Sequence, residues 1–205
     1  MTPSLVDPIM TPPTLMRRAV LRLVYLSVFL SVFLLNALNA SAETAQSPEA
    51  KAEEVISAFY TFDAEKLAPL LLSAKESAPS LLFYQGWAQG GNYKVLKRHA
   101  CVKINTEQVA CSITVDDDLV LALKREHKVT DTFTFSFADG NIISIETSSD
   151  DEPIYRDAFE WTVQTTPALM KEECAGFFED GPTPAKCARA MAKGFKRFAA
   201  QQNAQ

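Results

Sequence analysis

Hydrophobic and polar residues alternate most regularly between Val129 and Thr147, on either side of the tetrapeptide 138–141. Phe133, Phe135 and Phe137 alternate with threonine and serine, which is the period-two pattern of a half-buried strand. A second run of strand-forming residues follows the tetrapeptide. The segment therefore predicts an antiparallel hairpin with one apolar face, which must be covered by helices.

Two turns are compatible with this hairpin. A two-residue turn at Asp139-Gly140 pairs the three phenylalanines with a set that includes Ser144 and Glu146. A three-residue loop, with the glycine in the left-handed conformation, shifts the register and pairs Phe135 with Ile143. We predict the three-residue loop, because it leaves no carboxylate or hydroxyl opposite the phenylalanines.

The other elements follow from changes of hydrophobic period. Ser47 and Asp63 are expected to cap the first two helices, and the period later changes from 3.6 to 2. The predicted helices span about 48–61, 64–72, 80–88, 153–165 and 184–200, and a second hairpin spans 93–104 and 109–115. This order predicts an α+β fold, a curved antiparallel sheet with helices over its concave face and further C-terminal helices.

The first 42 residues have the pattern of a signal peptide. A basic segment at Arg17-Arg18 precedes an apolar run from Leu23 to Leu35, and Ala40-Ser41-Ala42 provides small residues at the expected cleavage site. The alternative is a retained anchor, but the apolar run is shorter than the roughly 20 residues that cross a bilayer. We expect residues 1–42 to be removed, and Met10 and Met16 are alternatives to Met1 as the true start.

Composition and net charge indicate one domain and argue against nucleic-acid binding. The 205-residue chain is 47% hydrophobic and has a formal net charge of −5, so one domain with a sizeable core is expected. Cleavage would remove three of the 20 basic and one of the 25 acidic residues, which leaves a net charge of −7. Such an acidic chain is not expected to bind nucleic acid, which requires a dense basic surface.

All four cysteines follow the expected leader. An even number of cysteines in an oxidising compartment predicts two disulfides. We predict the local pairs Cys101–Cys111 and Cys174–Cys187 and an exported protein, periplasmic or secreted. One observation opposes the first pair: if Val102 lies on the apolar face of its strand, Cys101 points the other way. Either a bulge restores the alternation, or this strand is buried on both faces.

Metal sites are not favoured by the sequence. Zinc could use His99 and His127 with Cys101 and Cys111, but no C-x-x-C pair is present. The aspartate run 116–118 lacks the ligand spacing of a calcium loop, and we interpret it as a solvated strand exit. No metal or cofactor is expected.

The last predicted helix is strongly amphipathic. Its apolar side carries Met191 and Phe195, and its other side carries five cations: Lys186, Arg189, Lys193, Lys196 and Arg197. A helix of this kind can lie on a membrane surface. In an acidic protein the cations more often form a solvated face paired with the protein body, and we predict that arrangement and no stable membrane anchor after cleavage.

Four segments resemble a known family. The stretches FYQGWAQ, DDDL, TDTFTFSFADGNIISIET and AFEWTVQTTP look like the SnoaL-like branch of the nuclear transport factor 2-like superfamily. The resemblance covers Pro48 to Pro167 and gives a domain at 43–167 with a disulfide-tied extension at 168–205. It implies a cone-shaped fold with an apolar pocket, frequent homodimers through the outer sheet face, and activities that range from isomerases to non-catalytic binders.

The pattern offers few catalytic residues. Asp131 shares the face of the phenylalanines, where apolar surroundings can raise the pKa of a carboxyl group until it acts as a general acid or base. His99 is its candidate partner. The candidate pocket residues are Tyr60, Phe83, Tyr84, Trp87 and Trp161. We predict a non-catalytic module that binds a small apolar ligand or a protein, and the alternative is a cofactor-free isomerase, cyclase or hydrolase that uses Asp131.

Overall fold

The computed structural model describes residues 46–175 and 185–204. These residues contain a five-stranded antiparallel sheet. The expected leader, residues 1–42, lies outside them. The strands are β1 (Lys94–Arg98), β2 (Val102–Lys103), β3 (Gln108–Asp116), β4 (Val129–Ala138) and β5 (Asn141–Ser149). They follow the order β1-β3-β4-β5, and β2 also pairs with β3. With the helices described below, this arrangement confirms the α+β class.

The β4–β5 hairpin does not have the predicted three-residue loop. Ala138 pairs directly with Asn141 across Asp139 and Gly140, whose φ angles of +49° and +74° are typical of a primed two-residue turn. A bulge then places an extra residue, the half-exposed Ile143, in β5, and Phe135 pairs with Ile145. The predicted turn is therefore wrong, and the bulge restores the apolar face that the turn alone would have interrupted.

The alternation predicted for β4 is confirmed. Its residues are buried at every second position from Val129 to Phe137, and Phe133 and Phe135 are fully buried. On the opposite face the hydroxyl groups pair across the strands. Ser112 lies 3.2 Å from Thr132, and Thr114 lies 3.2 Å from Thr130. The phenylalanine face therefore belongs to the core, and the outer face is polar.

The second hairpin is interrupted on one side. β1 ends at Arg98 and β2 begins at Val102, and this break turns Cys101 inward, where it forms the predicted disulfide with Cys111. The backbone N–H of Cys101 donates a hydrogen bond to Glu53, and Val102 is 58% exposed. Val102 therefore lies outside the core, and the conflict in strand alternation disappears.

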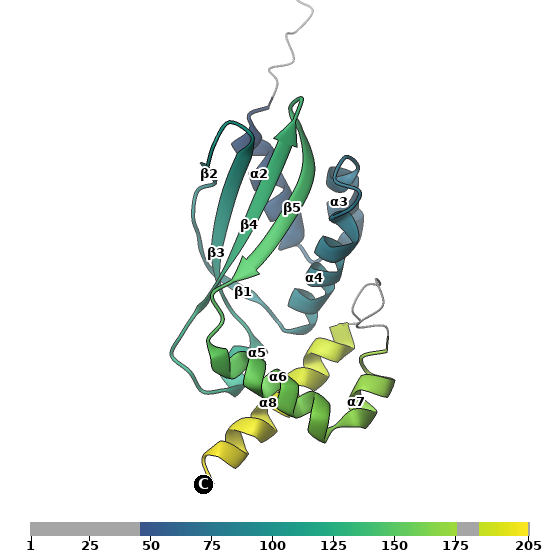
Figure 1. Cartoon of the computed structure of the whole chain (residues 1–205), viewed down its shortest axis with the longest axis vertical. Helices are drawn as coiled ribbons and strands as arrows, with labels where there is room; N and C mark the ends of the chain where they lie inside the picture. Colours follow the sequence, from purple (N-terminus) through teal and green to yellow (C-terminus); the bar gives the residue numbers. More distant parts are fainter. Residues whose placement is uncertain (1–45, 176–184, 205) are drawn as a thin grey trace, which may run out of the picture. The chain divides into compact units, whose positions relative to one another are not determined.

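Helices cover the apolar face of the sheet. They are α2 (Pro48–Phe59), α3 (Ala64–Leu67), the 3₁₀-helix η1 (Ala68–Leu71) and α4 (Ala78–Gly90). Ser47 and Asp63 cap α2 and α3 as predicted, each accepting a backbone N–H two or three residues ahead. Pro69 coincides with the change from α- to 3₁₀-helix. Figure 1 shows α2 and α4 on the same side of the sheet.

The remaining helices gather at the end of the sheet where β4 begins (Figure 1). They are α5 (Asp118–Ala122), α6 (Pro153–Thr165), α7 (Pro167–Glu172) and α8 (Ala185–Gln202). Of these, α6 and α8 correspond to the helices predicted at 153–165 and 184–200, and no helix was predicted over α7. The amphipathic α8 packs against α4, α5 and α6, and the predicted Cys174–Cys187 disulfide joins the end of α7 to the beginning of α8. Among the described helices, none is both long and apolar enough to cross a membrane.

Candidate functional site

Asp131 is the polar residue on the apolar face of β4. Its position in the strand turns the side chain inward, and it is 1% exposed. The hydroxyl of Tyr60, at the end of α2, donates a 3.2 Å hydrogen bond to the carboxylate Oδ2. The other oxygen, Oδ1, is buried and has no hydrogen-bond partner in the described structure. A buried acceptor without a partner is uncommon and unfavourable in native proteins.

Aromatic rings surround this carboxyl group. Phe133, two positions further along β4, contacts the ring of Phe59 with their centroids 5.1 Å apart. The centroid of Tyr84, from α4, lies 6.1 Å from that of Phe133 and 6.3 Å from that of Tyr93. Tyr60 and Tyr84 both keep some accessible surface, whereas Phe59 and Phe133 are fully buried. Asp131 is therefore enclosed by an aromatic wall whose outer members reach the surface.

The surroundings change the acidity of the site. Burial raises the pKa of Asp131 to about 7, the nearby hydroxyls of Tyr84 and Tyr60 lower it, and the acidic residues Asp151 and Asp117 raise it further. Burial also raises the pKa of Tyr60 and Tyr84 far above neutrality, so both hydroxyls stay protonated. At neutral pH, Asp131 can thus gain or lose a proton, while the tyrosines act only as neutral hydrogen-bonding groups.

The other candidate residues occupy three different environments. Phe83 is half-buried, and Trp87 is 8% exposed and belongs to the core. Trp161 packs against Phe198 of α8, with the ring centroids 5.8 Å apart. His99 is exposed between β1 and β2 and makes no side-chain contact with Asp131. Of the candidates, Tyr60 and Tyr84 are thus brought to Asp131.

The cysteines of the zinc alternative are joined to each other. Cys101 and Cys111 form a disulfide, so neither can provide the thiolate that zinc binds. Among the described residues, no group of three or more histidine, cysteine, aspartate or glutamate side chains is arranged to hold a metal ion.

Asp117 was misinterpreted from the sequence. It is 2% exposed, and its carboxylate accepts hydrogen bonds of 2.7 and 2.9 Å from the N–H groups of Leu119 and Val120. Asp117 is therefore the buried cap of α5 and not part of a solvated strand exit. Burial raises its pKa to about 6, although the two N–H groups lower it. An aspartate directly before an apolar segment is a capping signal that could have revealed this role.

Gln85 is a second buried polar residue that the sequence pattern did not reveal. Its amide nitrogen donates hydrogen bonds of 3.3 and 3.0 Å to the carbonyl groups of Ala58 and Phe59. These carbonyls lie at the end of α2, where they also accept the backbone N–H groups of Thr61 and Phe62. Gln85 thus fixes the end of α2, which carries Tyr60, against α4.

Comparisons of the chain with protein families, with curated proteins and with solved structures give no match.

Proposed function

We propose that this protein is an exported, non-catalytic module of the SnoaL-like type that binds a small, mainly apolar ligand, with Asp131 as the polar anchor of the site. The observation that carries the proposal is the buried Oδ1 of Asp131, which has no hydrogen-bond partner in the described part of the chain and lies behind an aromatic wall. Ligand sites in proteins combine apolar surfaces with a few converging polar groups. A ligand hydroxyl or amine that donates to Oδ1 would remove the cost of leaving this oxygen without a hydrogen bond.

Binding is favoured over catalysis by the groups around Asp131. The hydroxyl groups beside it belong to Tyr60 and Tyr84, whose raised pKa values keep them protonated at neutral pH, so neither can act as a base. His99 is exposed elsewhere. General acid–base catalysis commonly uses two groups of matched pKa, and Asp131 has no such partner among the described residues.

The anchor can be tested with two probes that differ by one hydroxyl group, 1-naphthol and naphthalene. Fluorescence titration of the purified protein should show tighter binding of 1-naphthol. Asp131→Leu removes the carboxyl group while leaving a side chain of similar size. We expect it to weaken 1-naphthol binding about tenfold, the effect of one buried hydrogen bond, and to leave naphthalene binding unchanged.

Circular dichroism must first show that the leucine variant folds. Asp139→Asn, an exposed carboxyl-to-amide change at the β4–β5 turn, serves as the control and should bind both probes like the parent. Equal loss of both probes in Asp131→Leu would indicate a damaged pocket, and no loss of either would show that Asp131 does not anchor a ligand.

The alternative is a cofactor-free isomerase, cyclase or hydrolase, and the pKa of Asp131 favours it. A carboxyl group that titrates near pH 7 can exchange a proton with a substrate at neutral pH. In that case Asp131→Asn should abolish turnover while the fold persists. A variant that keeps the parent's rate would exclude the enzyme hypothesis.

Two further features of the proposal concern location and assembly. The disulfides Cys101–Cys111 and Cys174–Cys187 support an oxidising compartment, periplasmic or extracellular. The polar outer face of the sheet, with its paired hydroxyls, is the surface through which we propose a homodimer.

A further inference from the structure

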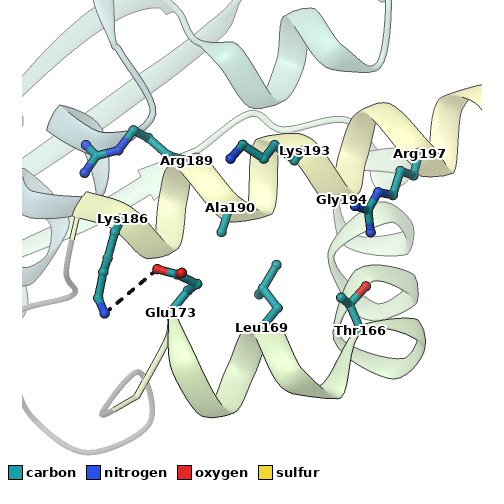
Figure 2. A pocket seen from close by; sticks show the side chains of 9 residues that line it. All are labelled: Thr166, Leu169, Glu173, Lys186, Arg189, Ala190, Lys193, Gly194 and Arg197. Carbon is teal, nitrogen blue, oxygen red and sulfur yellow. Dashed lines mark ion pairs between the residues drawn. The ribbon is translucent and has the colours of Figure 1, made fainter.

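A groove of about 350 Å³ lies between α7 and α8, far along the chain from Asp131. Its apolar wall comes from Leu169 of α7 and Ala190 of α8, which point toward each other in Figure 2. Four cations of α8 line it as well: Lys186, Arg189, Lys193 and Arg197. A hollow of this volume is at the lower end of the range in which small ligands bind.

The helical period brings most of these cations to one side of α8. At about 100° per residue, Lys186, Lys193 and Arg197 fall within an arc of roughly 40°, and Arg189 lies on its flank. The stripe from the first to the last of them is about 16 Å long. Several cations along one stripe can contact an anion that carries more than one charged group.

Among the described residues, little negative charge lies beside the cations of the groove. Glu173 is the acidic residue that lines it, and its carboxylate lies 3.8 Å from the Nζ of Lys186. Figure 2 shows this pair across the gap between the helices. Within the described residues, Arg189, Lys193 and Arg197 have no ion pair and no side-chain hydrogen bond. This charge contrasts with the net charge of −5 of the whole chain.

Two contacts restrain the helices that form the groove. The disulfide Cys174–Cys187 links them beside Glu173 and Lys186. Further along α8, Gly194 packs against Thr162 of α6 so closely that an added Cβ would lie 2.1 Å from the Thr162 methyl group. The groove therefore exists before any ligand arrives, which reduces the entropy lost on binding.

We propose that the α7–α8 groove is a binding site for a phosphate-bearing anion. Phosphate groups match the planar guanidinium forks of Arg189 and Arg197. A multiply charged anion matches Arg189, Lys193 and Arg197, which have no ion-pair partner within 46–175 and 185–204. A free organic phosphate and the headgroup of an acidic phospholipid share this chemistry. The site does not depend on Asp131 or on the ligand proposed for it.

The test uses sodium pyrophosphate and isothermal titration calorimetry on the purified protein. The groove variant Lys193→Gln/Arg197→Gln should weaken pyrophosphate binding at least about tenfold, because it removes charge-assisted hydrogen bonds. The matched control, Lys97→Gln/Lys196→Gln, removes the same charge from exposed positions outside the groove, and one of these lies on α8 itself. It should bind like the parent.

Three additional measurements make the result specific. The charge-preserving variant Lys193→Arg/Arg197→Lys should retain binding, which separates charge from folding defects. Sedimentation with phosphatidylglycerol vesicles, compared with phosphatidylcholine vesicles, distinguishes a lipid headgroup from a free phosphate. Binding should weaken as ionic strength rises from ~0.01 to ~1 M, over which the Debye length falls from about 30 to about 3 Å.

Specific loss of pyrophosphate or phosphatidylglycerol binding in the groove variant supports the site, and the probe that binds identifies the source of the phosphate. The proposal is overturned if neither probe binds the parent. It is also overturned if the groove variant and the matched control lose binding equally, because the effect would then reflect net charge alone.

Discussion

Asp131 shows how the surroundings of one residue determine its chemistry. In the sequence it is an aspartate at the beginning of a strand, where a solvated carboxylate is the ordinary expectation. In the structure it is 1% exposed, and its pKa is raised to about 7. The cause is desolvation by the packed aromatic rings, which disfavours the charged form.

The raised pKa predicts how stability depends on pH. As pH rises above the ordinary pKa of 3.8, the unfolded chain loses the Asp131 proton while the folded protein keeps it up to about pH 7. The stabilisation contributed by Asp131 is therefore fully present below about pH 4 and is lost as pH rises to about 7. Asn cannot ionise, so Asp131→Asn should remove this loss.

Urea unfolding of Asp131→Asn and of the parent provides the measurement. Relative to the parent, the variant should gain about 2 to 4 kcal/mol between pH 4 and pH 8. Asp139→Asn, at an exposed turn, is the control and should follow the parent's profile. Parallel profiles for Asp131→Asn and the parent would show that Asp131 is not desolvated.

The two faces of β4 predict opposite responses to truncation. Phe135→Ala should cost about 3 to 5 kcal/mol of unfolding free energy, because it empties a fully buried volume. Thr134→Ala, one residue earlier on the half-buried outer face, should cost less than about 1 kcal/mol. Chemical denaturation measures both, and a larger effect at Thr134 would mean that the assignment of the faces is inverted.

At the scale of elements, close packing of helices decides which residues are tolerated. Gly194 lets α8 approach α6, where Thr162 is fully buried. The hydroxyl of Thr162 has no hydrogen-bond partner in the described structure. Both residues look unremarkable in the sequence, because helical periodicity does not show which positions meet another helix.

This contact predicts a coupling between the two residues. Gly194→Ala should destabilise the protein by about 1 to 3 kcal/mol through steric overlap, despite the better helix propensity of alanine. In a Thr162→Ala background, which removes the overlapping methyl and hydroxyl groups, the same substitution should cost clearly less. A double-mutant cycle of unfolding free energies measures this difference, and strict additivity would contradict the contact.

At the scale of the whole molecule, the two disulfides are the strongest link between structure and compartment. Each joins cysteines that are near in sequence, with separations of 10 and 13 residues. In the chain-entropy model, loops of this size contribute about 2 to 3 kcal/mol each. Together with the signal-like beginning of the sequence, they support the proposed export.

The proposed export predicts which residue is the N-terminus of the mature protein. N-terminal sequencing of material recovered from outside the cytoplasm should start at Glu43, because Ala40-Ser41-Ala42 matches the expected cleavage site. Non-reducing peptide mapping of the same material should show the Cys101–Cys111 and Cys174–Cys187 pairs. An intact leader in the membrane fraction, or four free thiols, would contradict the proposal.

Local patterns in the sequence were sufficient to predict several features of the fold. The alternation in β4 predicted its buried face, and Ser47 and Asp63 marked the beginnings of α2 and α3. The span 153–165 matched α6. These features depend on interactions between residues that are close in sequence, so strand alternation and helix capping rules describe them.

Other features depended on tertiary structure. The bulge at Ile143 allows a two-residue turn to place Ile142 and Ile145 opposite Phe137 and Phe135, and this choice depends on the core against which the hairpin packs. The burial of Asp131 and Asp117 depends on which helices cover them, and the basic groove exists only because α7 and α8 lie side by side. Sequence periodicity describes the faces of single elements, whereas desolvation and cavities arise between elements that are far apart in the chain.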